Sequence, residues 1–256
     1  RALSLGLRLW SGWQVFQQLE AGQGTNAAWN RADTIAYIQN NLSELAGESG
    51  RTGGHDTLYG GAGNDIIFGD LGVVDQLSLK LLSTGDVTEI RSEQFGKGEA
   101  DYIEGGNDDD VIIGGNKGDE IHVGEGNNIV LGDEGWIKYN NDENLADIDL
   151  IESLSTTAAG GVDTITTGTG NDIIIGGRFG DTIIANAGDN LVIGDSGRIT
   201  AASTDGPQFG VAMTYGLIET IEFDDGGSDT ITTLGGSDII IAGTNDSIDN
   251  NETVVD

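Results

Sequence analysis

Aspartate recurs at every ninth residue along most of this chain. Stepping by nine gives four ladders, and ten of their thirteen positions are Asp. The ladders are Asp56 and Asp65; Asp101, Asp110, Asp119 and Asn128; Asp163, Asp172, Asp181 and Asn190; and Asp229, Asp238 and Ser247. Carboxylates at a fixed spacing are either a solvated acidic surface or a row of cation ligands.

An apolar ladder follows the acidic one at a constant offset. Two residues after each of the first twelve ladder positions stands an aliphatic residue: Leu58, Ile67, Ile103, Ile112, Ile121, Val130, Ile165, Ile174, Ile183, Val192, Ile231 and Ile240. A longer period is superimposed, because the motifs "FGDLGVV", "LGDEGWI" and "IGDSGRI" place Asp70, Asp133 and Asp195 at intervals of 63 and 62 residues. The chain is therefore an internal-repeat protein.

Composition excludes several classes of function. The net charge is −32, which opposes binding to nucleic acid and to an anionic membrane surface. The absence of cysteine excludes disulfides and thiolate metal sites, and no apolar run is long enough to span a membrane. The 43 glycines come with one proline, so glycine is positional here rather than a sign of a flexible linker.

The nonapeptide predicts a short strand after a tight turn. Positions one to six are rich in glycine, which permits positive φ, and positions seven to nine are mostly β-branched or apolar. Two nonapeptides close one coil of a parallel solenoid with position eight pointing inward. Repeat i then stacks on repeat i+2, so that Asp101 lies over Asp119, Asp110 over Asn128, Asp163 over Asp181 and Asp172 over Asn190.

The stacked carboxylates are expected to bind a hard cation. Carboxylates about 5 Å apart repel one another by about 1–3 kcal/mol per pair, and the narrow aliphatic core offsets this poorly. Ca²⁺ accepts six to eight carboxylate and carbonyl oxygens in flexible loops, whereas Mg²⁺ demands octahedral geometry and retains its waters. We therefore expect several calcium ions and a metal-free fold that is marginal or absent.

Three stretches carry a resemblance to a known family. "GGAGNDIIF" (60–68) has every defined residue of the nonapeptide G-G-x-G-x-D-x-U-x, and "TGTGNDIII" (167–175) and "GGNDDDVII" (105–113) are close to it. The chain thus resembles RTX, or hemolysin-type, calcium-binding proteins. The resemblance implies an all-β, right-handed parallel β-roll that is exported by type I secretion and folds in calcium outside a bacterium, either secreted or at the cell surface.

The resemblance also implies the ligands. They are the ladder residues, with backbone carbonyls from the turn glycines: Asp56, Asp65, Asp101, Asp110, Asp119, Asn128, Asp163, Asp172, Asp181, Asn190, Asp229 and Asp238, with Gly61, Gly63, Gly106, Gly115, Gly168, Gly170 and Gly177. Asn128, Asn190 and Ser247 are weaker ligands, and Glu99 and Asp108 replace the glycine of position four. Asp70, Asp133 and Asp195 either cap the last site of a block or only form its exit turn.

The repeats fall into blocks separated by insertions. We predict a flank at 1–50 with one strand and one amphipathic helix, then repeat blocks at 51–72, 96–135, 158–197 and 224–250, separated by insertions at 73–95, 136–157 and 198–223. Each insertion ends in an alternating strand, "DVTEIRS", "DLIESLS" or "GLIETIEF", and reads as a hairpin. Edge capping is favoured over partner binding as the role of the insertions.

The expected function is structural. The chain reads as a calcium-dependent spacer, adhesin stalk or surface-assembly module of a large bacterial protein, and not as an enzyme. "GDSGR" (194–198) resembles a serine-protease nucleophile stretch, but the equivalent turns carry Leu71 and Glu134 in place of Ser196. The alternatives are the calcium-binding secretion domain of an RTX toxin or enzyme, and a self-assembling filament or surface layer. Expected partners are calcium ions, and neighbouring repeats or further copies of the chain.

Overall fold

The computed structural model describes residues 53–77, 87–93, 95–139, 147–154, 159–202, 213–224 and 226–243, and the backbone of 247–250. The chain divides into two compact units, Arg1–Thr52 and Gly53–Asp256, and every described residue lies in the second. The predicted strand and helix of the N-terminal flank fall outside the described residues. Within them the secondary structure is all β, and no helix of membrane-spanning length and hydropathy occurs there.

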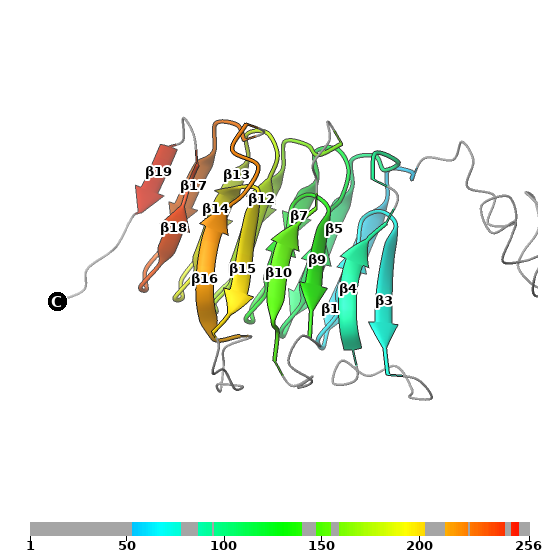
Figure 1. Ribbon diagram of the computed structural model, residues 1–256, viewed down its shortest axis with the longest axis horizontal. Helices are drawn as coiled ribbons and strands as arrows, with labels where there is room; N and C mark the ends of the chain where they lie inside the picture. The colour runs from blue at the N-terminus through cyan, green and yellow to red at the C-terminus, as the bar shows by residue number, and fades with distance from the viewer. Residues whose placement is uncertain are drawn as a thin grey trace, which may run out of the picture. The chain divides into compact units, whose positions relative to one another are not determined.

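Two parallel sheets form the predicted roll (Figure 1). Sheet A contains, in spatial order, β1 (Thr57–Ala62), β5 (Tyr102–Asn107), β7 (Glu120–His122), β11 (Thr164–Thr166), β13 (Thr182–Ala185), β17 (Thr230–Thr233) and β19 (Ser247–Asn250). Sheet B contains β2 (Ile66–Phe68), β6 (Val111–Ile113), β8 (Ile129–Leu131), β12 (Ile173–Gly177), β14 (Leu191–Asp195) and β18 (Ile239–Ile241). Successive repeats alternate between the two sheets, so that each coil contains one strand of each.

The twelve aliphatic residues of position eight form the core between sheets A and B, as predicted. Nine of them are buried, from Ile103 to Ile231, and Leu58, Ile67 and Ile240 at the two ends are partly buried against them. Register confirms the stacking of alternate repeats, because Ile103 pairs with Ile121 and Ile174 with Val192.

The insertions form a third sheet. Sheet C contains the hairpins β3 (Gly72–Gln76) and β4 (Val87–Ser92), β9 (Gly135–Lys138) and β10 (Leu150–Ser153), and β15 (Gly197–Ala201) and β16 (Tyr215–Thr220). Neighbouring hairpins pair through β4 with β9 and β10 with β15, so all six strands are antiparallel and continuous (Figure 1). The hairpin prediction is confirmed for the described strands.

Sheet C covers the outer face of sheet B. An apolar row crosses sheet C from Val74 through Ile90, Ile137, Ile151 and Ile199 to Ile218. This row packs with positions seven and nine of the sheet B strands in a second core, including Ile113, Leu131 and Ile175. The insertions therefore cover a face of the roll, which corrects the expectation that they cap its edge.

The length of each block follows from this third layer. One hairpin adds two strands to sheet C, and the two coils between insertions add two strands to sheet A and two to sheet B. Because hydrogen-bonded strands lie about 4.8 Å apart, all three layers advance together by about 10 Å per repeat of 62 or 63 residues. Four nonapeptides per hairpin therefore give all three sheets the same advance along the roll.

Candidate metal centre

Two rows of turns join the sheets. The A-to-B turns lead from a sheet A strand into a sheet B strand, at residues 60–65, 105–110, 123–128, 167–172, 185–190 and 233–238. The B-to-A turns end at Asp56, Asp101, Asp119, Asp163, Asp181 and Asp229, and all three insertions interrupt this second row. The ladder residues are therefore divided between two edges of the roll.

Positive φ at positions two and four shapes the turns. Gly61 and Gly63 have φ of 107° and 103°, and Gly126 and Gly170 have 137° and 140°. In three turns position four is not glycine but still has positive φ, with 79° at Asp108, 76° at Lys117 and 70° at Phe179. The left-handed conformation at these positions is thus required by the turn and tolerated by larger side chains.

Hydrogen bonds link successive ladder residues from one coil to the next, from Asp56 to Asp229 in one row and from Asp65 to Asp238 in the other. The backbone N–H of Asp101 donates to Oδ1 of Asp119 at 2.7 Å, and that of Asp163 donates to Oδ1 of Asp181 at 2.8 Å. In the other row, Asp110 donates to Asn128 and Asp172 donates to Asn190, both at 3.0 Å. All four predicted stacked pairs are thus confirmed as neighbours. The same bond links Asp56 to Asp101, Asp119 to Asp163, Asp181 to Asp229, Asp65 to Asp110, Asn128 to Asp172 and Asn190 to Asp238.

The second oxygen of most ladder carboxylates has no partner. Among the described residues, Oδ2 is buried without a hydrogen bond in Asp65, Asp101, Asp110, Asp119, Asp163, Asp172, Asp181 and Asp238. Burying a carboxylate without compensation is strongly unfavourable. Accordingly, burial raises the pKa of Asp101 to about 6 and the pKa values of Asp119 and Asp181 to about 9, and it raises that of Asp163 well above 3.8. These orphaned oxygens fit a divalent cation.

Position one is glycine in several turns because the carboxylate lies there. A Cβ added at Gly60 or Gly105 would lie 2.8 Å from Oδ2 of the aspartate at position six of the same turn. At Gly114 and Gly176 the corresponding distances to Asp119 and Asp181 are 2.6 and 2.5 Å. A side chain there would fill the space beside the free oxygen.

The insertions leave this arrangement intact. At Gly69, which precedes the first insertion, a Cβ would lie 2.6 Å from Oδ2 of Asp101, which follows it. The same holds for Gly132 with Asp163 at 2.3 Å and for Gly194 with Asp229 at 2.2 Å. Each re-entering aspartate thus occupies the ladder position that an uninterrupted repeat would supply.

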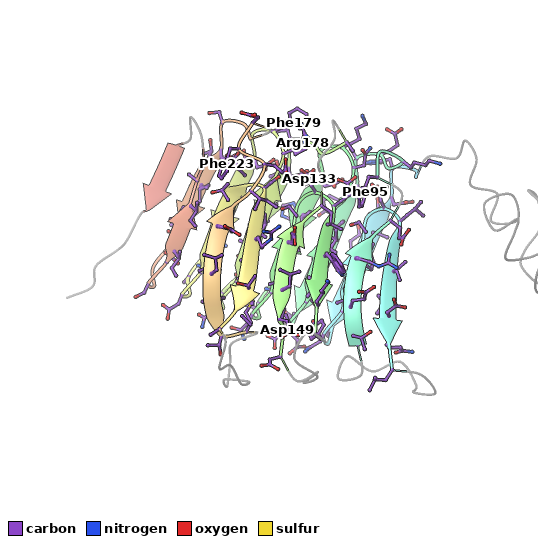
Figure 2. The ribbon with its side chains drawn as sticks, in the orientation of Figure 1. Phe95, Asp133, Asp149, Arg178, Phe179 and Phe223 are labelled. Atoms are coloured by element: carbon purple, nitrogen blue, oxygen red, sulfur yellow. The ribbon has the colours of Figure 1, made fainter. Side chains whose placement is uncertain are left out.

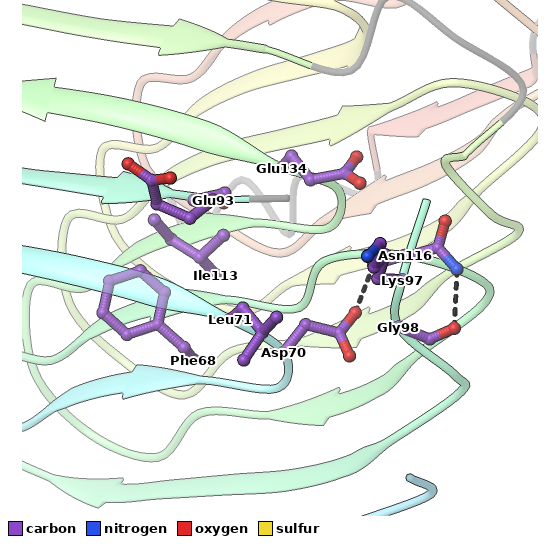
Figure 3. A pocket seen from close by; sticks show the side chains of 10 residues that line it. Phe68, Asp70, Leu71, Glu93, Lys97, Gly98, Ile113, Asn116 and Glu134 are labelled. Carbon is purple, nitrogen blue, oxygen red and sulfur yellow. Dashed lines mark hydrogen bonds between the residues drawn. The ribbon is translucent and has the colours of Figure 1, made fainter. Parts of the chain in front are cut away.

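The exit-turn aspartates close these interrupted turns. Oδ1 of Asp133 accepts the N–H of Gly161 at 2.8 Å, and its Oδ2 accepts the N–H of Arg178 in the next coil; Figure 2 shows Asp133 and Arg178 near one another. Asp70 accepts from Asn116 at 2.7 Å (Figure 3), and Asp195 accepts from Gly227 at 3.1 Å. Burial raises the pKa of Asp133 to about 8. These hydrogen bonds show that the three aspartates help to form the exit turns. Their role as metal ligands stays a prediction.

The predicted carbonyl donors lie in both rows. Gly61, Gly63, Gly106, Gly168 and Gly170 are in A-to-B turns. Gly115 and Gly177 are in B-to-A turns, where an added Cβ would lie 2.7 and 2.4 Å from Oδ2 of Asp70 and Asp133, respectively. Among the described residues no three His, Asp or Glu side chains converge on one point. A cation in these turns would therefore take much of its oxygen shell from the backbone.

A second ladder at position five was not predicted. The N–H of Asn127 donates to Oδ1 of Asp109 at 2.8 Å, that of Asn171 to Asn127 at 2.9 Å, and that of Asp189 to Asn171 at 2.8 Å. This ladder is exposed. Each of its N–H groups donates to a side chain of the preceding coil, whereas the N–H groups of the position-six ladder donate to side chains of the following coil. Its signal in the sequence is the run of Asn or Asp at position five of the first five A-to-B turns.

Ser196 and His122 lie outside the two ladders. Ser196 has no exposed surface, so a substrate does not reach its hydroxyl. His122 lies on sheet A, and its Nε2 is 2.9 Å from Oε1 of Glu120.

The comparison with protein families identifies the repeat. A family model described as the RTX calcium-binding nonapeptide repeat (4 copies) matches residues 52–73, 95–119, 104–136, 157–178 and 166–198. No curated protein and no solved structure matches the chain. The strands of the block at 224–250 continue both sheets of the roll beyond the matched residues. The matched segments are RTX calcium-binding nonapeptide repeats, and Ca²⁺ is the ion that these repeats bind.

Proposed function

We propose that this chain is a calcium-dependent structural segment of a larger secreted or cell-surface bacterial protein, acting as a spacer, stalk or assembly module without catalytic activity. The observation that carries the proposal is the continuous ladder of buried carboxylates, which runs past two insertions without a break. Such a ladder is unfavourable without cations and favourable with them, so folding follows the calcium concentration.

The surroundings of the ladder support a mechanical rather than a chemical role. The ladder carboxylates accept backbone N–H groups of the preceding coil, which is a repeating structural contact. The chain would stay unfolded in the low calcium of the cytosol, pass through a type I secretion channel and fold outside. An RTX secretion domain of a toxin or enzyme would share this behaviour, and an activity-bearing domain elsewhere in the parent protein would distinguish it.

Circular dichroism and single-molecule force spectroscopy test the proposal. Protein stripped of calcium should lack β signal at pH 7.5, gain it on addition of calcium and fail to gain it with magnesium. A single molecule pulled from its two ends should resist force in calcium and extend without a rupture event in chelator. A chain that is equally folded and equally resistant in chelator would refute calcium-dependent folding.

A further inference from the structure

Two of the six A-to-B turns carry asparagine in place of aspartate at position six. From Asp110 onward the row alternates, with Asn128, Asp172, Asn190 and Asp238 following in order. In every case Oδ1 accepts a backbone N–H from the previous coil. In Asn128 and Asn190 this acceptor role fixes the amide orientation, because only the oxygen accepts and the nitrogen must point the other way.

The amide nitrogen of Asn128 lies among three oxygens. Nδ2 is 3.1 Å from the carbonyl oxygen of Gly126, 3.3 Å from that of Gly124, and 3.0 Å from Oδ1 of Asp172 in the next coil. Two carbonyls of one turn and one carboxylate of the next are the donor types expected of a calcium site. Here an N–H₂ group donates to all three.

Asn190 repeats the arrangement 62 residues later. Its Nδ2 is 3.0 Å from the carbonyl oxygen of Asn186 and 3.2 Å from that of Gly188. These residues hold positions two and four of their turn, as Gly124 and Gly126 do in theirs. The contact therefore belongs to the asparagine and to the turn, not to one local sequence.

The aspartate turns of the same row present the opposite chemistry. Oδ1 of Asp110 accepts the N–H of Asp65 at 2.9 Å, which leaves Oδ2 in the place that Nδ2 takes in the asparagine turns. This Oδ2 is buried and unpartnered among the described residues, and so is that of Asp172. An oxygen facing carbonyl oxygens needs a cation between them, whereas an amide nitrogen supplies its own donors.

We propose that the side-chain amides of Asn128 and Asn190 occupy the cation position of their turns, so that calcium in the A-to-B row is confined to the aspartate turns. This inference rests on calcium binding by the repeats and goes beyond the proposed structural role. The A-to-B turn of the last coil before each of the second and third insertions then holds no calcium. From Asp110 onward the calcium sites of this row lie two coils apart, which weakens the repulsion between neighbouring ions.

Counting bound calcium ions in single variants tests the assignment. Wild type and variants are equilibrated with calcium, separated from free ion and analysed by elemental mass spectrometry, with folding checked by circular dichroism. We expect Asn128→Asp to bind one ion more than wild type, Asn128→Ala to bind the wild-type number, and Asp172→Asn to bind one fewer. Asn171→Asp, an exposed change next to the row, is the matched control and should leave the number unchanged.

If Asn128→Asp does not fold, Asn128→Ala still tests whether Asn128 is a calcium ligand. A wild-type protein that binds calcium, together with an Asn128→Ala variant that binds one ion fewer, would show that the asparagine is itself a ligand and would overturn the assignment. A folded Asn128→Asp variant with the wild-type number of ions would also overturn it. Both results leave the proposed function standing, because that fails only if wild type folds without calcium.

Discussion

The backbone N–H of Asp119 donates to Oδ1 of Asp163 over 2.7 Å, although the two are 44 positions apart in the sequence and a hairpin leaves and rejoins the roll on the way. The contact has the same form as those between coils with no insertion, where the partners are 18 positions apart. The insertion therefore adds a layer to the fold without disturbing the ladder. Conditions that alter the buried carboxylates should act along its whole length.

Acid should replace calcium as the agent that folds the metal-free chain. Burial raises the pKa of Asp101 to about 6, that of Asp133 to about 8, and those of Asp119 and Asp181 to about 9, all from 3.8. A raised folded-state pKa contributes stability that is complete below the unfolded value and is lost as pH rises through the folded value. Calcium-stripped protein should be most stable near pH 4 and lose stability progressively up to pH 9.

Thermal melts of calcium-stripped protein at pH 4, 6, 7.5 and 9 measure this dependence. In saturating calcium the trend should reverse between pH 4 and pH 7.5, because the metal binds the deprotonated carboxylates and releases protons. Metal-free stability that increases from pH 4 to pH 9 would contradict the assignment of the buried ladder as neutral in the absence of metal.

Replacing a central ladder carboxylate should have opposite effects with and without calcium. Asp163 has no exposed surface, and its Oδ2 has no partner among the described residues. Asp163→Asn keeps the shape and the Oδ1 acceptor but removes a carboxyl whose pKa is raised well above 3.8 by burial, and which must therefore take up a proton when the metal-free chain folds. At pH 7.5 we expect this variant to be more stable than wild type in chelator and less stable in saturating calcium.

The exposed aspartate at the start of the same row supplies the control. Asp56 donates its N–H to Asp101 but its side chain lies in solvent, so Asp56→Asn should change the midpoint of unfolding little under either condition. Denaturant titrations in saturating calcium, and the β signal in circular dichroism in chelator, compare the two variants with wild type. Equal destabilisation of Asp163→Asn in both conditions would indicate a packing defect instead of a lost ion.

Much of the roll could be predicted from the sequence because its two ladders are local. A polar position six and an apolar position eight, repeated every nine residues, fix the turn, the strand and the inward face, and the Asp101–Asp119 and Asp172–Asn190 pairs follow from the closure of a coil. Sheet C could not be found in this way, because it depends on pairing between strands of successive hairpins, such as Ile90 of β4 with Ile137 of β9.

A signal for the third layer was nevertheless present in the strand tripeptides. Strands of sheet A alternate, as in "TIT" (164–166) and "EIH" (120–122), and so bury one face. Strands of sheet B are apolar throughout, as in "III" (173–175) and "IVL" (129–131), which is typical of a parallel strand covered on both sides. When the tripeptides of the two sheets are compared separately, the pattern predicts that a further layer covers sheet B and not sheet A. The amide contacts of Asn128 depend on side-chain orientation, which spacing alone does not give.

Sheet C should contribute strongly to stability even in saturating calcium. Ile151 lies in β10, is fully buried, and pairs with Ile137 and Ile199 in the apolar row that faces sheet B. Ile151→Ala removes this contact and leaves a cavity, at a cost of about 2–5 kcal/mol in the free energy of unfolding. Leu217→Ala on β16, where the side chain is 50% exposed, is the control and should cost less than about 1 kcal/mol.

Urea denaturation in excess calcium measures both variants. If Ile151→Ala were as stable as the Leu217→Ala control, sheet C would not form a shared core with sheet B in solution.

Glycine at position one should be irreplaceable where it borders a buried carboxylate. A Cβ at Gly114 would lie 2.3 Å from the carbonyl oxygen of Gly132 and 2.6 Å from Oδ2 of Asp119, and neither neighbour sits at the end of a long flexible side chain. Gly114→Ala should therefore lower the free energy of unfolding by about 1–3 kcal/mol or more and weaken calcium binding through displacement of Asp119. Gly54→Ala, where nothing lies within 4 Å of the added carbon, should do neither. Calcium binding by the two variants is measured by isothermal titration calorimetry, and their stability by urea denaturation. If Gly114→Ala bound calcium with the affinity of wild type, the carboxylate of Asp119 would take no part in holding the ion.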